Sequence, residues 1–385
     1  MDPTRDSRRG AGLYLHIPYC SRICPYCDFA VTRGGAADRS RYARGLESEI
    51  DLWSGEPFRF DTVYFGGGTP STLTEDDLAR VLETIESRLS VDDGAGVFLE
   101  ANPEDASPER CRAWRSLGVG TLSLGVQSFA KAELKRLGRR HDREGARRAV
   151  ERAREAGFET VSIDLIYGLP GQRTEDWRRN LEELVRLAPD HASCYQLTFH
   201  EGTPYGTGLR KGVLRELPDE DQAALFELTH RYLGDSGYEG YEVSSFARAP
   251  RHRSRHNRKY WDHSPYLGLG ASSHSFRNRE RWWNERNVDD YSRRLAAGER
   301  PVAGRETLAD SDLALEAVML GLRTREGIDL DSLRFLYGVD LLALNRERIE
   351  RSVERGLARL ESGRLSLTVR GLAVTDAIAR ELRIE

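Results

Sequence analysis

Six short apolar runs alternate with amphipathic helical patterns over the first half of the chain, and this alternation limits its fold more than any other feature. The runs are continuously hydrophobic, as strands are when a sheet is covered on both faces. Repeated strand–helix–strand units predict an α/β fold with a parallel sheet and right-handed crossovers, here a partial (β/α)6 barrel of the TIM type. The predicted strands are residues 13–17, 62–65, 97–100, 121–126, 161–166 and 193–198.

The segments between these runs have the pattern of surface helices. The clearest is residues 75–89, where apolar side chains recur at helical spacing, Thr74 stands at the N-cap position and acidic residues occupy the first turn. Residues 143–156 and 174–187 show similar patterns. Past residue 303 helical patterns dominate, which predicts a small winged-helix-like α+β domain. Its expected elements are helices over 311–322, 330–337, 341–361 and 376–382 and a strand over 365–368.

Composition limits the possible functions. The 385-residue chain has a formal net charge of -4 and no isolated basic field, so nucleic-acid binding is not expected. Its apolar runs are far shorter than the ~20 residues of a transmembrane helix, which predicts a soluble, cytoplasmic protein. We expect four parts: a disordered tail (1–12), the partial barrel (13–240), an extension (241–303) and the C-terminal domain (304–385).

Three cysteines, Cys20, Cys24 and Cys27, lie within eight residues directly after the first predicted strand. A disulfide framework is not expected, because the chain is long, has five cysteines and shows no signal peptide. Zinc could take the three thiolates together with His16, although structural zinc sites usually pair two separated C-x2-C knuckles. Iron–sulfur clusters normally take four thiolates, so a triplet leaves one iron open for chemistry. The spacing favours an iron–sulfur cluster and leaves zinc as the alternative.

Glycines or polar residues mark the ends of the next predicted strands. Residues 66–70 form a glycine run, where backbone amides can approach a ligand closely. Glu100, Gln127 and Asp164 belong to the ends of the third, fourth and fifth strands. Each alone could be a loop cap. Because the carboxyl ends of barrel strands meet at one face, together they predict ligands for one polar cofactor.

The cysteine segment resembles the signature of the radical S-adenosylmethionine (SAM) superfamily, C-x3-C-x2-C with an aromatic residue, here Tyr26, before the last cysteine. The resemblance implies a [4Fe-4S] cluster whose open iron binds SAM, which one electron then cleaves to a 5′-deoxyadenosyl radical. Over nearly its full length the chain is also similar to the oxygen-independent coproporphyrinogen III oxidase family, through residues 14–18, 66–70, 100, 125–129, 164–170 and 268–276. This similarity implies a SAM site that contains Tyr14, Tyr26, Gly67, Gly68, Thr69, Glu100, Gln127, Arg139, Asp164 and Leu197.

Two departures separate this sequence from the true oxidases of that family. Those carry C-x3-C-x2-C-x-C, whereas here Asp28, Phe29 and Ala30 follow the third cysteine. They also have a longer amino-terminal extension, whereas only a short arginine-rich tail precedes residue 13. Decarboxylation of coproporphyrinogen III, or another radical reaction on a tetrapyrrole, is therefore the alternative function rather than the leading one.

The segment that starts at His256 and ends at Trp261 reads H-N-R-K-Y-W. Imidazole is a common axial ligand of heme iron, and aromatic rings stack on porphyrins. A surface histidine in a basic loop is the simpler interpretation of the spacing alone. The segment resembles the H-N-x-x-Y-W motif of heme chaperones in the family, which implies that His256 helps to bind heme.

The leading expectation is thus a heme chaperone of the radical SAM kind. It would bind a [4Fe-4S] cluster, SAM and heme, and pass heme to an acceptor protein. A reductant such as flavodoxin or ferredoxin is an expected partner, and contact with a membrane would occur only through the acceptor. Whether SAM is cleaved, and so whether the chain is an enzyme, stays open at this point. A zinc-bound scaffold is the third hypothesis.

Overall fold

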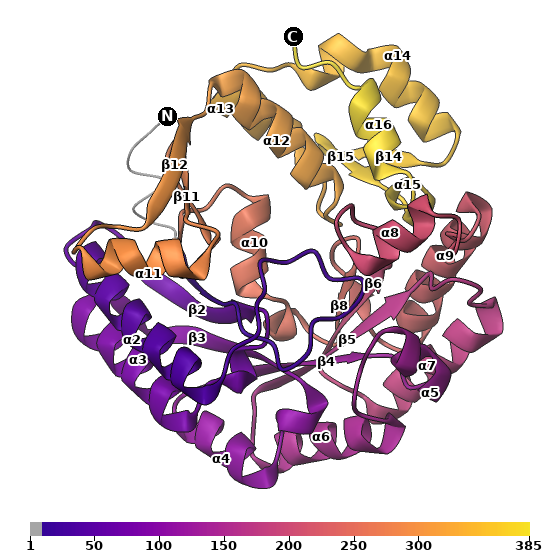
Figure 1. Cartoon of the computed structure of the whole chain (residues 1–385). Coiled ribbons are helices and arrows are strands. Elements are labelled where there is room, and N and C mark those ends of the chain that lie inside the picture. The colour runs from indigo at the N-terminus through magenta and orange to yellow at the C-terminus, as the bar shows by residue number, and fades with distance from the viewer. Residues whose placement is uncertain (1–9) are drawn as a thin grey trace.

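The computed structural model describes residues 10–385. Its centre is a parallel sheet in which six strands follow one another in chain order, which confirms the predicted partial barrel (Figure 1). Most of the expected tail lies outside the described residues, while Ala11 and Gly12 already form the start of the first strand. The six strands are β1 (Ala11–Ile17), β2 (Phe60–Gly67), β3 (Val91–Ala101), β4 (Thr121–Gln127), β5 (Thr160–Tyr167) and β6 (His191–Gln196).

Strand β6 begins two residues before the predicted 193–198. The sequence pattern missed its start because His191 is polar, yet this side chain is buried. Its Nδ1 lies 2.8 Å from Ser162 Oγ and its Nε2 lies 2.8 Å from the Tyr241 hydroxyl. A polar residue whose two ring nitrogens are both paired fits the interior as well as an apolar one.

Helices cover the outer face of this sheet (Figure 1). The three predicted helices are present, and Thr74 caps the first by accepting a hydrogen bond from the Asp77 amide. The apolar faces of these helices pack on the sheet. Polar side chains that could bind a ligand therefore lie at the strand ends and in the loops that follow them. The helices of this layer are α2 (Ala36–Trp53), α3 (Glu75–Arg88), α4 (Pro108–Ser116), α5 (Lys131–Arg136), α6 (Arg143–Glu155) and α7 (Thr174–Leu187).

Short strands extend the sheet at both edges, so that the described residues form an open 12-stranded sheet rather than a closed barrel. Beside β1 lies the parallel strand β9 (Tyr266–Leu269), followed by three antiparallel strands. The expected extension, residues 241–303, thus contributes to the same sheet as the barrel. The added elements are α8 (Pro204–Arg210), α9 (Asp219–Asp235), β7 (Glu239–Gly240), β8 (Ser245–Ala247), α10 (Arg255–Trp261), β10 (His274–Arg277), β11 (Glu280–Asn284), α11 (Val288–Ala296) and β12 (Val302–Thr307).

The C-terminal domain combines helices with a three-stranded antiparallel sheet in the order β13-β15-β14, which agrees with the predicted winged-helix-like lobe. The predicted helix over 341–361 is too long. It ends at Glu354 because Gly356 turns the chain with φ +68°, and the last four residues form a strand instead. The elements are α12 (Asp310–Leu322), β13 (Ile328–Asp329), α13 (Leu330–Tyr337), α14 (Leu341–Glu354), β14 (Ala358–Glu361), β15 (Arg364–Leu367), α15 (Val369–Leu372) and α16 (Thr375–Glu381).

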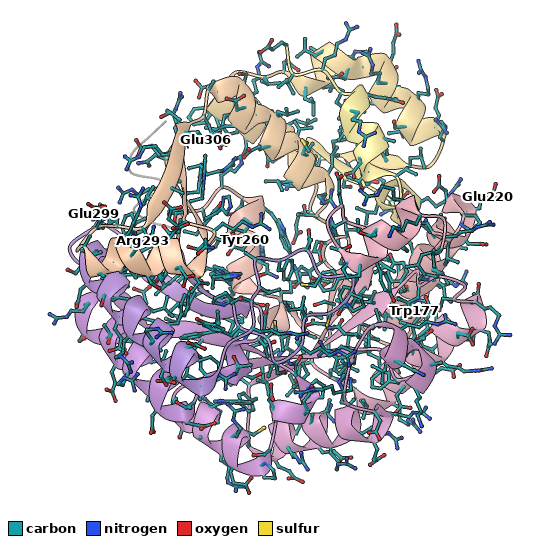
Figure 2. All side chains as sticks on the ribbon, in the orientation of Figure 1. Trp177, Glu220, Tyr260, Arg293, Glu299 and Glu306 are labelled. Carbon is teal, nitrogen blue, oxygen red and sulfur yellow. The ribbon has the colours of Figure 1, made fainter. Side chains whose placement is uncertain are left out.

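Apolar side chains fill the space between the sheet and its helices (Figure 2). Trp177 of α7 is fully buried, and its Nε1 donates to Thr229 Oγ1 of α9 at 2.8 Å. Acidic side chains such as Glu220 and Glu299 are exposed at the rim. Within residues 10–385, every helix is too short or too polar to span a bilayer.

Candidate functional site

The cysteine loop leaves β1 and is fixed at both ends by backbone hydrogen bonds. The Cys20 amide donates to Thr32 O at 3.0 Å, and the Thr32 amide donates to Pro18 O at 2.8 Å. Cys20 is buried, whereas Cys24 and Cys27 are half-buried. Burial raises the pKa of Cys20 and raises that of Cys27 to about 11, so these two thiols are protonated at neutral pH when no metal is bound.

The donors around these sulfurs fit an iron–sulfur cluster. Thr69 Oγ1 lies 3.4 Å from Cys20 Sγ, and the Arg139 guanidinium lies 3.6 Å from Cys24 Sγ, where both favour thiolates. Within residues 10–385, no three side chains already stand so that they could hold a single metal ion. Thiolates of a cubane cluster bind different irons and need not converge on one point. The three cysteines are thus a suitable ligand set for such a cluster.

His16 was the fourth ligand in the zinc alternative. Its Nε2 lies 2.9 Å from Ala30 O and its Nδ1 lies 3.2 Å from the Tyr14 hydroxyl. The ring is buried and ties β1 to the far end of the cysteine loop. Both ring nitrogens of His16 therefore already have partners, and Nε2 holds the loop, which favours the cluster over zinc.

A cavity of about 390 Å³ opens beside the cysteine loop, at the carboxyl ends of the strands. It brings together almost all residues that the sequence suggested for the cluster and for SAM. Tyr14 lines a neighbouring cavity of about 340 Å³, which shares Gly67 and Glu100 with the first. His256 lines neither. The predicted residues in the first cavity are Cys20, Cys24, Tyr26, Cys27, Gly67, Gly68, Thr69, Glu100, Gln127, Arg139, Asp164 and Leu197.

Two carboxyl groups face this cavity from neighbouring parts of the barrel. The Tyr64 hydroxyl donates to Glu100 Oε1 at 2.7 Å, and Ser123 Oγ donates to Asp164 Oδ2 at 3.0 Å. Desolvation inside the barrel raises the pKa of Glu100 to about 7 and that of Asp164 to about 6. A cationic or hydroxyl-rich ligand would stabilise their charged forms and take up their free lone pairs.

Gln127 is held in an uncommon backbone conformation at the end of β4. Its φ is +68°, and the pairing of β4 with β5 shifts register between Gly125 and Gln127. A Cβ on Gly125 would lie only 2.9 Å from the side-chain Nε2 of Gln127, so glycine makes room for this side chain. Strained residues of this kind persist where a site requires a defined side-chain position.

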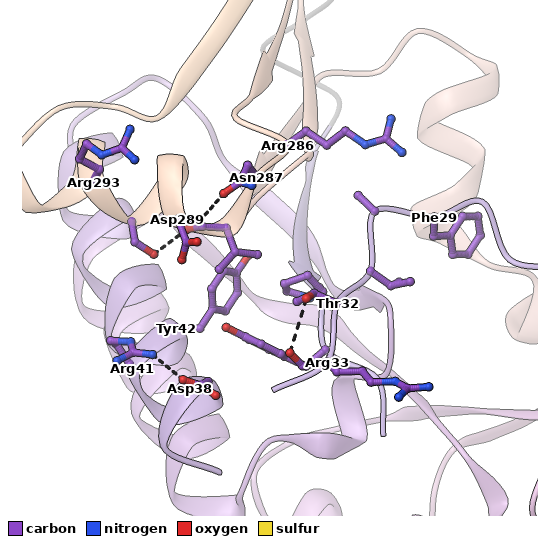
Figure 3. A pocket seen from close by; sticks show the side chains of 16 residues that line it. Phe29, Thr32, Arg33, Asp38, Arg41, Tyr42, Arg286, Asn287, Asp289 and Arg293 are labelled. Atoms are coloured by element: carbon purple, nitrogen blue, oxygen red, sulfur yellow. Dashed lines mark hydrogen bonds and ion pairs between the residues drawn. The ribbon is translucent and has the colours of Figure 1, made fainter. Parts of the chain in front are cut away.

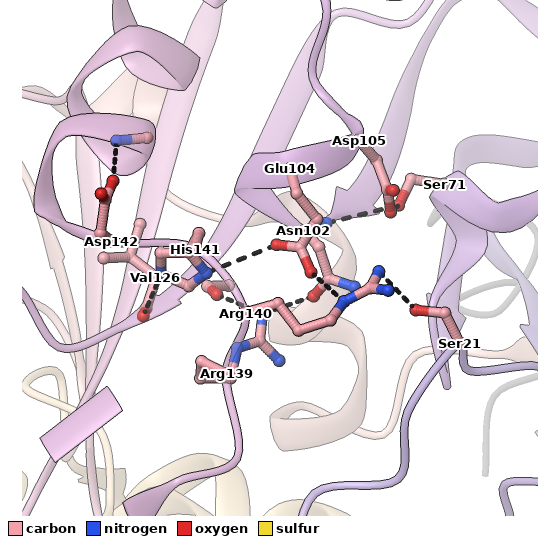
Figure 4. A network of polar contacts seen from close by, with 12 residues as sticks. Ser21, Ser71, Asn102, Glu104, Asp105, Val126, Arg139, Arg140, His141 and Asp142 are labelled. Atoms are coloured by element: carbon pink, nitrogen blue, oxygen red, sulfur yellow. Dashed lines mark hydrogen bonds and ion pairs between the residues drawn. The ribbon is translucent and has the colours of Figure 1, made fainter. Parts of the chain in front are cut away.

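Arg139 connects the cysteine loop to the strand ends. Its guanidinium donates to Gly125 O at 2.6 Å and to Asn102 Oδ1. The adjacent Arg140 points to the other side and donates to Ser21 Oγ at 3.0 Å (Figure 4). Arg139 and Arg140 therefore hold the cysteine loop from two directions, and of these two arginines Arg139 lines the cavity.

Close packing against β1 and the cysteine loop leaves room only for glycine at the end of β2. Gly67 has φ +108°, and a Cβ there would lie 2.6 Å from the His16 ring. The Gly68 amide donates to Ile17 O at 2.8 Å, and a Cβ on Gly68 would lie 3.0 Å from Cys20 Sγ. The glycine run therefore lies against the cysteine loop with no room for side chains, and the predicted approach of its amides to a ligand stays a prediction.

His256 lies inside the molecule and 1% of its surface is exposed. Its Nδ1 is 2.9 Å from Thr62 Oγ1 and its Nε2 is 2.9 Å from the Tyr260 hydroxyl. Burial lowers its pKa to about 3, so the ring is neutral. Helix α10 turns this side chain inward to stack on Tyr64, at 4.9 Å between ring centroids. Neither ring nitrogen of His256 is therefore accessible to a heme, as the predicted contact would require.

Several residues of the site were not predicted from the sequence. Tyr64 and Ser123 hold the two carboxylates, and Asn102 binds Arg139. Tyr64 lies two residues before Gly66, and Ser123 lies two residues before Gly125. Residues two apart in a strand share one face, so the alternation of side chains along each strand could have identified them. Their partners are distant in sequence, and local patterns do not reveal such pairs.

Models of known families match two parts of the chain. The radical SAM superfamily model matches residues 14–184, and the HemN C-terminal domain model matches residues 308–374. A solved structure titled as the coproporphyrinogen III oxidase HemN of Escherichia coli, a radical SAM enzyme, superposes with a TM-score of 0.83 at 22% identity, covering 97% of this chain and 89% of that one. This likeness establishes a common fold.

Sequence relatives match over almost the whole length. The chain is 36% identical to the heme chaperone HemW of Mycobacterium tuberculosis, covering 96% of this chain and 94% of that protein. It is 32% identical to HemW of Bacillus subtilis, over 93% and 95% of the two chains. Identity to the mitochondrial radical S-adenosyl methionine domain-containing protein 1 of Bos taurus is 33%, over 99% and 89%. The chain therefore belongs to the radical SAM superfamily and, within it, to the family of the heme chaperone HemW.

Proposed function

We propose that this protein is a heme chaperone of the radical SAM type, which holds a [4Fe-4S] cluster and SAM and passes heme to an acceptor protein. The observation that carries the proposal is the cavity in which three thiols meet the polar strand ends. Support also comes from the relatives named heme chaperones, which match 96% and 93% of this chain.

Cys20, Cys24 and Cys27 would hold the cluster, and the iron without a thiolate would bind the amino and carboxylate groups of SAM. The cluster would supply the electron for reductive cleavage of SAM. Glu100 and Asp164 offer acceptors to hydroxyl or ammonium groups. Arg139 and His16 fix the loop that carries the thiolates. The remaining predicted residues, Tyr14, Tyr26, Gly67, Gly68, Thr69, Gln127 and Leu197, would complete the walls of the SAM site.

The contact of His256 with heme stays a prediction, as do the reductant, the acceptor and the cytoplasmic location. For His256 to bind heme iron, its Nε2 would first have to release Tyr260 and reach the surface. Oxidation of coproporphyrinogen III stays the alternative from the sequence. The likeness to the oxidase HemN supports the fold and not this activity.

An anaerobic hemin titration of the reconstituted protein tests the proposal. We expect saturable binding near one heme per chain, four irons per chain before hemin is added, and calorimetric binding of SAM. The matched variants are Cys27→Ser, which should lose the cluster, and Cys111→Ser, which replaces a buried thiol remote from the cavity. Absence of saturable hemin binding, or cluster assembly in Cys27→Ser equal to that in Cys111→Ser, would contradict the proposal.

A further inference from the structure

A cavity of about 800 Å³ lies against the cysteine loop, where the end of that loop meets helices α2 and α11 (Figure 3). Its walls come from residues 29–33 of the loop, from the first two turns of α2 and from the segment 286–293. Four arginines line it against two aspartates, so the cavity has a net positive charge, to which the N-termini of both helices add. The charged side chains are Arg33, Arg41, Arg286, Arg293, Asp38 and Asp289.

The guanidinium groups of this cavity are available to an external partner. Arg33 and Arg286 are exposed, and neither side chain has an ion pair or a hydrogen bond with any of residues 10–385. Arg41 and Arg293 each pair with an aspartate of their own helix, at 2.5 Å and 2.7 Å, but these arginine side chains are 70% and 74% exposed. Ion pairs exposed to this degree are weak, so carboxylates of a partner can bind all four arginines.

An exposed aromatic ring lines the same cavity. Of the surface of Phe29, 62% is exposed, and this residue also lines the two cavities of the candidate SAM site. Figure 3 shows Arg33 and Arg286 extending toward the side on which Phe29 lies. Aromatic residues and arginine are enriched at protein–protein interfaces and dominate their binding energy. The combination therefore fits the acidic surface of a protein better than it fits a small anion.

The cavity lies directly beside the thiols of the loop. Thr32, which lines it, accepts the hydrogen bond of the Cys20 amide at 3.0 Å. Tyr19, another lining residue, precedes Cys20 in the chain, and Phe29 follows Cys27 by two residues. A protein seated on this cavity is thus connected to both ends of the cysteine motif through one hydrogen bond or a few covalent bonds.

The proposed function requires an electron at this loop, because the cluster has to be reduced before SAM can be cleaved. Electron-transfer complexes are weak and bury less than about 1,200 Å², so a small patch is sufficient for them. Complementary charges raise the rate of encounter and orient the partners. The position and the charge of the cavity therefore indicate an acidic electron carrier as the partner.

We infer that Phe29, Arg33, Arg41, Arg286 and Arg293, here called the arginine patch, form the docking surface for a small acidic one-electron carrier protein of the flavodoxin type. The inference rests on the proposed function, because the cluster is the acceptor of the electron. In the transfer step the anionic flavin hydroquinone loses one electron and becomes the neutral semiquinone, while the [4Fe-4S] cluster changes from charge 2+ to charge 1+. No proton moves, and no bond forms or breaks.

The test is anaerobic calorimetry of the reconstituted full chain with an acidic flavodoxin in its hydroquinone form, together with stopped-flow measurement of cluster reduction. The variant is Arg33→Glu/Arg286→Glu. Its matched control is Arg231→Glu/Arg370→Glu, which changes the net charge equally at exposed arginines of α9 and α15 that do not line the cavity.

We expect the variant to bind flavodoxin at least about tenfold more weakly than wild type and to be reduced correspondingly more slowly, whereas the control should bind like wild type. The neutral version, Arg33→Gln/Arg286→Gln, should have an intermediate affinity. An increase in ionic strength from about 0.05 M to about 0.5 M should weaken wild-type binding and narrow the difference between the variants. Dithionite, which needs no docking, should reduce the cluster of every variant to the same extent.

The outcomes separate the inference from the proposed function. If variant and control bind flavodoxin equally, or if wild type does not bind it although dithionite reduces its cluster, the inference is wrong and the proposed function stands. If the variant instead loses transfer of heme to an acceptor while its flavodoxin affinity equals that of the control, the patch serves the acceptor and the inference is also wrong. If wild type assembles no cluster that dithionite can reduce, both fail. Arg33 and Arg286 are exposed, so the variants are expected to fold normally and to contain as much iron as wild type.

Discussion

Replacement of His256 by glutamine tests the buried position of this residue. Glutamine has one acceptor and one donor group, so it can keep both hydrogen bonds, to Thr62 and Tyr260, but it does not take up a proton. In the wild type, burial lowers the pKa of His256 from 6.5 to about 3. Below pH 6.5 the unfolded chain therefore binds a proton at this position, and the folded chain does not.

The stability contributed by the neutral ring is complete above pH 6.5 and decreases as the pH falls toward 3. The slope is about 1.4 kcal/mol per pH unit, which amounts to about 2 kcal/mol between pH 7.5 and pH 5.0. Urea unfolding followed by tryptophan fluorescence at these two pH values measures it. We expect His256→Gln to lose about 2 kcal/mol less than wild type on acidification. The other buried histidines are common to both chains and cancel.

A second variant, His200→Gln at a half-exposed position, controls for the exchange of imidazole for amide. It should follow the wild-type dependence more closely than His256→Gln does. Equal losses of stability in wild type and His256→Gln would refute the reasoning, because a buried neutral imidazole cannot avoid this linkage. In that case His256 would have to be accessible to protons in the folded state, and its predicted role in heme binding would gain support.

Three further predictions concern the site and its supports. Gly67→Ala places a methyl group 2.6 Å from the His16 ring and should weaken SAM binding, measured by calorimetry, at least about tenfold. Gly94→Ala, which has open space at its Cβ, should bind SAM like wild type. Equal affinities of the two variants would contradict the packing argument. Arg139→Lys loses the forked contacts of the guanidinium and should also weaken SAM binding at least about tenfold, whereas Arg140→Lys should bind like wild type. Burial raises the pKa of Glu49 from 4.5 to about 7. The free energy of unfolding therefore falls by up to about 3 kcal/mol as the pH rises from 4.5 to 7. Glu49→Gln should remove that part of the loss in melting experiments at pH 5 and pH 8, and unchanged slopes would count against a buried, protonated carboxyl.

Much of the lining of the candidate cavity could be predicted from the sequence, because its polar residues lie at strand ends. The carboxyl ends of parallel strands face the same side, so Glu100, Gln127 and Asp164 had to meet once the strands were recognised. The three cysteines are local in sequence and needed no fold to be noticed. Arg139 and Leu197 came from the family resemblance: Arg139 was placed by its offset from Gln127 although Arg140 stands beside it, and Leu197 offers only packing or backbone contacts.

Non-local contacts account for what the sequence did not reveal. The segment before His256 is rich in arginine and reads as surface, yet α10 directs this side chain into the interior, where Thr62 and Tyr260 pair with it. The edge strands β10 to β12 are short, and their pairing joins segments separated by loops. The stacked pair formed by His274 and Trp283 depends on that pairing. Local periodicity carries no information about it.

Transfer of heme is the central claim, and a transfer assay tests it most directly. The chain is loaded with hemin under anaerobic conditions and mixed with heme-depleted membranes, and the return of a heme-dependent oxidase activity is followed against an equal amount of free hemin. We predict that the loaded chain restores activity faster than free hemin and loses its Soret absorbance in step. Retention of heme by the chain, or restoration no faster than with free hemin, would contradict the account.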